Sequence, residues 1–245
     1  MVRKMEHHFL CPKCRIKTVL PACNNCGYEI PQIKSIVHFC DGTSVKLEGE
    51  KQYIGYDNIG EDFEPEITYA SFCNVEQEAG RIEKYISSGF FRSIDVCGGE
   101  NLRPLEDFLP LYRKAELYHL IKKMHVGESG PAEDVRRAVE VLGLDEVHHG
   151  INAAASGEVM RFLADNRIQL NVCPSSNVML GYAADYENHP IKVLYENGVK
   201  VTINTDDLLL FDSSIESEYL RLYQAGTLSA EQLDEIRING LGEVK

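Results

Sequence analysis

Four cysteines near the start of the chain have the spacing of a metal site. The stretch "CPKCRIKTVLPACNNCGYE" holds two C-x-x-C pairs, and Gly27 follows the second. Each pair aims two thiolates at one point, and two pairs complete a tetrahedral set. The pattern predicts a structural zinc ribbon over residues 1–31, with Cys11, Cys14, Cys23 and Cys26 as ligands. Free thiols and redox pairs are the less favoured alternatives, because a redox C-x-x-C belongs in a βαβ context.

A second set of polar residues stands where apolar runs end. One such histidine or aspartate is more often a packing or capping residue, but several at the same structural position indicate a site. The run ends in question are "CGGE" with Gly98, "MHVGE" with His125 and Glu128, "VHHG" with His148 and His149, "CPSSN" with Asn177, and "NTDD" with Asp206 and Asp207.

Strands and helices must alternate to bring these ends together. The apolar runs predict strands over residues 66–73, 90–99, 120–128, 146–150, 168–174 and 199–207. Amphipathic stretches predict helices over 76–87, 104–117, 131–143 and 156–166 and two more at the end, the last with a capping box from Ser229 to Gln232. Strict alternation indicates parallel βαβ units, whose strands all end at one rim.

The strand ends resemble those of the adenosine deaminase family, part of the metal-dependent hydrolases. "MHVGESG" is similar to its H-A-G-E, "VHHGINA" to its G-H-G or H-H-G, and "NVCPSSN" to its C-P-x-S-N. "NHPIKVLYENGVKVTINTDD" resembles its H-P helix and closing T-D-D. The match runs from about residue 74 to 245. It implies a (β/α)8 barrel and hydrolysis of a 6-aminopurine nucleoside to the 6-oxo product and ammonia.

The resemblance also implies a catalytic zinc. Its ligands would include His125 and Asp206, a neutral imidazole and a carboxylate that suit a zinc with an open water position. His149 would orient the water and assist with its proton. Asp207 would hold the same water.

The remaining implied roles concern the purine. Glu128 would protonate the ring nitrogen N1, so that negative charge does not build up during attack at C6. Asp207 would accept a hydrogen bond from the base. Gly98 would present its backbone N–H to the purine, where a side chain would block close approach.

The chain departs from the family at its first strand, which carries two zinc ligands as H-x-H. No H-x-H occurs here, and His38 and Cys40 in "SIVHFCDGTSV" are the nearest candidates, with an ordinary strand favoured. About thirty residues separate His38 from Ile67, too few for two helices and a strand. We therefore predict an α/β fold with a zinc ribbon (1–31), a connecting segment (32–65) and a partial (β/α)8 barrel of five or six units (66–245).

Composition limits the remaining possibilities. The net charge of −13 argues against a general nucleic-acid binder, and neither a long apolar span nor a signal-peptide pattern occurs, so we expect a cytoplasmic protein. The first 65 residues also resemble the leading segment of certain bacterial methyltransferases, but no glycine-rich cofactor loop follows. The alternatives are a non-catalytic protein whose ribbon binds protein or nucleic acid, and an amidohydrolase acting on adenine or a modified adenosine. Oligomeric state is not predicted.

Overall fold

The computed structural model describes the backbone of four short strands before residue 48, and residues 64–207 and 210–241 in full. The chain divides into two units, residues 1–64 and 65–245. In the first, β1 (His8–Leu10) pairs antiparallel with β2 (Lys17–Val19), and β3 (Ser35–His38) with β4 (Ser44–Leu47). The predicted ribbon ligands and Cys40 lie outside the described residues.

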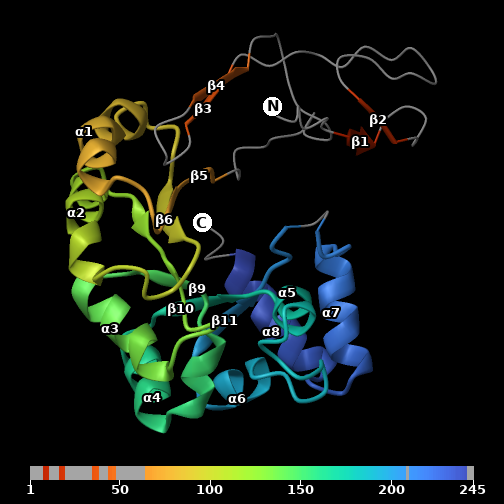
Figure 1. The fold of residues 1–245 in the computed structure, drawn as a ribbon. Helices are drawn as coiled ribbons and strands as arrows, with labels where there is room; N and C mark the ends of the chain where they lie inside the picture. Colours follow the sequence, from red (N-terminus) through yellow and green to blue (C-terminus); the bar gives the residue numbers. More distant parts are fainter. Residues whose placement is uncertain are drawn as a thin grey trace. The chain divides into compact units, whose positions relative to one another are not determined.

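The strands of the second unit are all parallel and follow chain order, in two sheets ordered β5-β6-β7 and β8-β9-β10-β11 (Figure 1). Their bounds are β5 Glu66–Ala70, β6 Ser93–Cys97, β7 Ile121–Lys122, β8 His125–Val126, β9 Glu146–His149, β10 Gln169–Val172 and β11 Lys200–Ile203. The parallel α/β class predicted from the alternation is therefore confirmed.

One predicted strand is divided in two. Residues 120–128 form β7, which pairs with β6, and β8, which pairs with β9. Between them, the N–H of Lys123 donates to Ile94 O at 2.8 Å and the N–H of His148 donates to Met124 O at 2.9 Å. The segment thus changes partner along its length and forms the seam between the two sheets.

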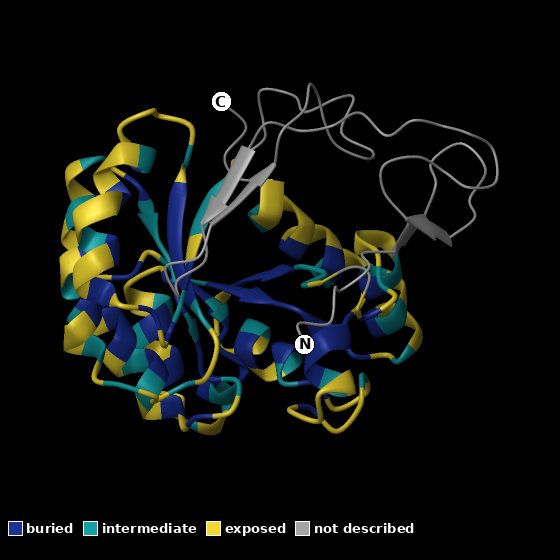
Figure 2. Ribbon diagram, turned by 45° about the horizontal axis from the view of Figure 1, so that its top comes forward, coloured by how far each residue is buried: buried dark blue, intermediate teal, exposed yellow. Residues whose placement is uncertain are grey.

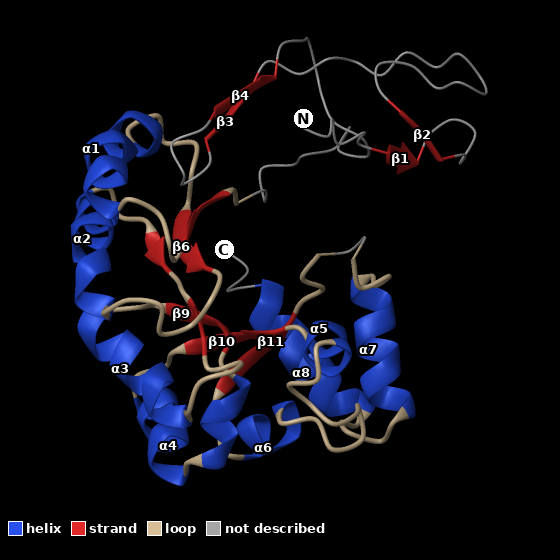
Figure 3. Cartoon of the chain, viewed as in Figure 1, coloured by secondary structure: helices blue, strands red, loops and turns tan. Residues whose placement is uncertain are grey.

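The helices pack on the outer side of these strands, with exposed outer faces and buried inner faces (Figures 2 and 3). Their bounds are α1 Val75–Ile86, α2 Leu109–Leu117, α3 Ala132–Leu142, α4 Gly157–Asp165, α5 Pro174–Met179, α6 Ile191–Glu196, α7 Ile215–Gln224 and α8 Ala230–Leu241, with 3₁₀ turns at Leu105–Phe108 and Ile151–Ala155. The capping box of α8 is confirmed by Gln232 Oε1, which accepts from Ser229 N at 2.8 Å, and Ser229 Oγ, which accepts from Gln232 N at 3.3 Å.

Helix α5 is the element that the sequence pattern misses, because "CPSSN" was interpreted as a strand end. Pro174 opens this helix, where a missing N–H costs nothing and a fixed φ favours the first turn. Asn177 lies inside the helix and is fully buried. The helix therefore carries a polar side chain inward at the end of β10.

A polar chain of side chains links the strands across the seam. Lys123 Nζ lies 3.3 Å from Glu66 Oε2 and 3.2 Å from Glu146 Oε2. Asn171 Nδ2 donates to Glu146 Oε2 at 2.8 Å, and Thr202 Oγ1 donates to Asn171 Oδ1 at 2.8 Å. These contacts connect β5 with β11 by way of the segment that joins β7 to β8.

Among the described helices, none is long and apolar enough to cross a membrane.

Candidate active site

Four of the predicted site residues meet at the carboxyl ends of β8, β9 and β11. Val126 pairs with His149 in register, and the rings of His125 and His149 lie 5.2 Å apart between centroids. His149 Nδ1 lies 3.4 Å from Glu128 Oε1, and His149 Nε2 lies 3.9 Å from Asp206 Oδ2. His149 is therefore the centre of the cluster, with the other three side chains around it.

Asp207 adjoins this cluster, and Gly98 lies at the end of β6 against Ser71. The N–H of Asp207 donates to Asp206 Oδ1 at 2.8 Å, and the Asp207 residue is exposed. Gly98 directly follows β6 with φ of 103°, and a Cβ there would lie 3.0 Å from Ser71 Oγ. Both the backbone angle and the close neighbour therefore require glycine at this position.

Two site residues have left-handed backbone angles that side chains normally avoid. His149 has φ of 62° and Asp206 has φ of 55°. Such angles cost roughly 1–3 kcal/mol each and persist only where the surrounding structure holds them. His149 is the last residue of β9 and Asp206 is the third residue after β11, so the two angles occur where the chain leaves the sheet.

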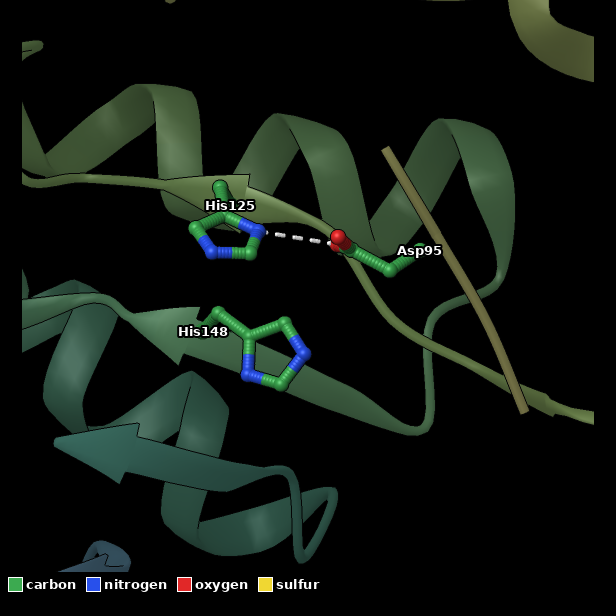
Figure 4. Close-up of side chains that lie close together, drawn as sticks. All are labelled: Asp95, His125 and His148. Atoms are coloured by element: carbon green, nitrogen blue, oxygen red, sulfur yellow. Dashed lines mark hydrogen bonds and ion pairs between the residues drawn. The ribbon is translucent and has the colours of Figure 1, made fainter. Parts of the chain in front are cut away.

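His125 is held by a buried carboxylate. Its Nδ1 lies 3.0 Å from Asp95 Oδ1, and the Asp95 side chain is 0% exposed (Figure 4). Burial lowers the pKa of His125, but the hydrogen bond and charge of Asp95 outweigh it and raise the pKa overall. A carboxylate on Nδ1 fixes the ring orientation and leaves Nε2 as the nitrogen for a metal.

The His148 ring lies next to the His125 ring (Figure 4). Its ring centroid lies 4.6 Å from that of His125, its Nε2 lies 3.2 Å from Glu66 Oε1, and its Nδ1 lies 3.5 Å from Asn171 Nδ2. Burial raises the pKa of Glu66, but the hydrogen bond and charge of His148, with Lys123, lower it to about 2. The adjacent histidines thus point to different surroundings, and His149 is the one that faces Glu128 and Asp206.

The pKa values of Glu128 and His149 are shifted in opposite directions. Burial, and after it the charges of Asp206 and Glu100, raise the pKa of Glu128 to about 7. The hydrogen bond that Asn177 Nδ2 donates to Glu128 Oε1 at 2.7 Å lowers this pKa but does not outweigh them. Burial and then the charge of His125 lower the pKa of His149 to about 4. At neutral pH the carboxyl can therefore deliver a proton, and the imidazole is neutral.

The donors at the rim fit a zinc ion in chemical type. His149, Cys173 and Asp206 offer ligand atoms within 4.8 Å of one another, and Asp95, His125 and His148 form a second such group. Neutral imidazole and carboxylate are usual zinc ligands. The two ligands implied by the resemblance, His125 and Asp206, fall in different groups, and His149 lies between them.

Three residues near the site were not assigned a role from the sequence. Asp95 is a charged residue inside the buried strand "SIDVC", which is the signal that could have found it. Asn177 contacts Glu128 and also His149 Nδ1 at 3.3 Å, but its position depends on the unpredicted helix α5. Cys173 is buried beside His149 and Asp206, and burial raises the pKa of its thiol.

Comparison with known proteins gives a family match over most of the second unit. The family model described as adenosine deaminase matches residues 73–243. A Treponema pallidum protein, provisionally named an adenosine/adenine deaminase, is 44% identical over 166 residues, which cover 66% of this chain and 54% of the relative. An adenine deaminase of Rhodopseudomonas palustris is 35% identical over 149 residues, which cover 61% of this chain and 43% of the relative.

A solved structure supports the fold. The crystal structure of adenine deaminase from Arthrobacter aurescens superposes with a TM-score of 0.68 at 22% identity, over 74% of this chain and 56% of that one. The chain thus shares the TIM-barrel-like fold of that structure over the part that superposes. The chain spans about half the length of the curated relatives it matches.

Proposed function

Because the chain belongs to the adenosine deaminase family, we propose that it takes part in hydrolytic deamination of a 6-aminopurine, with the 6-oxo purine and ammonia as products. The observation that carries the proposal is the pairing of Glu128, whose pKa is raised to about 7, with the neutral His149 beside Asp206. Attack of water on C6 requires a proton donor for the purine ring and a neutral imidazole for the water, and both lie at one rim here.

Each residue has a distinct task in this reaction. Nε2 of His125 and a carboxylate oxygen of Asp206 would hold a zinc ion, which when bound acidifies water near the rim. Glu128 gives its proton to N1 of the purine ring. His149 and Asp207 hydrogen-bond the attacking water and orient it toward C6. The two-ligand set is smaller than the three protein ligands usual for catalytic zinc, so we expect weak metal retention.

The substrate is proposed as a nucleoside, with free adenine or a modified adenosine as the second candidate. The names of the relatives include both adenosine and adenine. The deciding experiment follows ammonia release from adenosine and from adenine by the zinc-supplemented chain, with Asp206→Asn as the blank. Release from adenine alone would overturn the nucleoside assignment, and release from neither at any zinc concentration would count against deamination by this chain.

The four-cysteine ribbon remains a separate proposal about residues 1–31. If Cys11, Cys14, Cys23 and Cys26 hold one zinc, the purified chain keeps about one equivalent after mild chelation. Cys23→Ser should release it while the amide spectrum of residues 65–241 stays unchanged. Retention of that zinc by a Cys11→Ser, Cys23→Ser double variant would exclude the ribbon. The alternative is a non-catalytic protein whose ribbon binds protein or nucleic acid. It predicts that the ribbon holds zinc and that the chain deaminates no purine.

A further inference from the structure

The loop that carries Glu128 is attached to a single carboxylate from another strand. Residues 127–130 connect β8 to α3, and Glu100 follows β6. Glu100 Oε1 accepts from Glu128 N at 2.9 Å, Ser129 N at 2.7 Å and Ser129 Oγ at 3.1 Å. Glu100 Oε2 accepts from Gly127 N at 2.9 Å and Gly130 N at 3.1 Å. Four consecutive backbone N–H groups therefore point at one side chain.

We propose that Glu100 is the positioning residue for Glu128 and holds in place the loop that carries it. The inference rests on the proposed function only in the task it gives to Glu128. Among the hydrogen bonds of the described residues, none joins Glu100 to the rim histidines or to Asp206. It acts through the loop backbone.

The geometry suits a carboxylate and no smaller or neutral group. Hydrogen bonds to an ionised acceptor are about twice as strong as neutral ones, and here five donors share two oxygens. Burial raises the pKa of Glu100, but the backbone hydrogen bonds from the loop outweigh it and lower the pKa. Glu100 is thus charged at neutral pH, and removing one oxygen would leave at least two of the N–H groups without an acceptor.

The loop sequence is adapted to this contact. A Cβ on Gly130 would lie 2.7 Å from Glu100 Oε2, and a Cβ on Gly127 would lie 2.2 Å from Val135 Cγ2. From the other side, Asn152 Nδ2 donates to Glu128 O at 3.0 Å and Gly130 O at 2.8 Å. The N–H groups of the loop are therefore held by Glu100 and two of its carbonyls by Asn152, and the absence of a side chain at Gly130 leaves room for the carboxylate.

The first test is amide hydrogen exchange of the whole chain in Glu100→Gln. We expect exchange at residues 127–130 to become faster by at least about tenfold, because an amide side chain cannot accept from all four N–H groups. Gly130→Ala should have the same effect without a change of charge, since its methyl group displaces the carboxylate. Glu106→Gln is the matched control, because Glu106 pairs with Arg137 at an exposed position. Unchanged exchange in both loop variants would overturn the proposal.

The second test follows the amide ¹H–¹⁵N shifts of residues 127–130 as the pH is lowered into the acidic range. In the wild-type chain the four amides should shift together when Glu100 takes up a proton, because all four donate to its carboxylate. This common shift should be absent in Glu100→Gln and kept in Glu106→Gln. Both measurements are independent of turnover. If the wild-type chain deaminates no purine, the proposed function fails, but the contact between Glu100 and the 127–130 loop is still tested. If Glu100→Gln changes neither the exchange nor the titration of the loop amides, the positioning role of Glu100 fails whatever the substrate.

Discussion

A chain supplied with an H-x-H strand is expected to turn over adenosine at least about four orders of magnitude faster than the chain described here. A catalytic zinc is usually held by three protein ligands plus water, and His125 and Asp206 alone would leave it exchangeable and poor at lowering the pKa of water. Each factor of ten corresponds to about 1.4 kcal/mol of transition-state stabilisation. The measurement replaces residues 1–65, the segment before β5, with a family segment bearing H-x-H, and assays adenosine at saturating zinc.

The control for this replacement is the same segment with both histidines changed to alanine, which restores chain length without ligands. Its activity should stay at the level of the original chain. Ordinary enzyme rates in the original chain, abolished by His38→Ala or Cys40→Ala, would show that "HFCDGT" supplies the missing ligands and that the site is complete.

Glu128→Gln in the H-x-H-bearing chain is expected to lower kcat/KM by about a thousandfold. Glutamine keeps the size and the acceptor for Asn177 Nδ2, but it has no proton to give to N1, and general acid catalysis is typically worth 10²–10⁴-fold. The pKa of Glu128 is raised to about 7, so the acid is present below that pH and is lost above it. In the parent, kcat/KM should therefore fall as pH rises through about 7, and the variant should lack this limb.

Glu140→Gln is the matched control for this prediction, because Glu140 lies on α3 and pairs with Arg136 at the surface. It removes one carboxylate of the same type and should leave both the rate and the pH limb unchanged. A Glu128→Gln variant with a rate within tenfold of its parent would rule out Glu128 as the acid.

Local patterning was sufficient to predict most elements of the second unit. Apolar runs and amphipathic stretches placed β5, β6, β9, β10 and β11 and helices α1, α3 and α4 within a few residues, because the hydrophobic period and the capping residues are local properties. It failed at α5, where a helix starts directly at Pro174 without the loop residues that usually separate it from a strand. It also failed at the seam, because a change of pairing partner between Lys122 and His125 leaves no local signature.

The sequence by itself determined which polar groups stand at the strand ends and their order along the chain, since parallel strands with polar ends must bring those ends to one rim. His125, Glu128, His149 and Asp206 were predicted to lie there in this way, and the roles proposed for them come from the resemblance to the adenosine deaminase family. Only the tertiary structure decided what surrounds them. Asp95 reaches His125 from 30 residues away, Asn177 reaches Glu128 from 49, and Glu100 reaches the 127–130 loop from about 28. The protonation of Glu128 and His149 follows from this burial and these neighbouring charges, which come from several strands at once and are therefore absent from any local stretch of the chain.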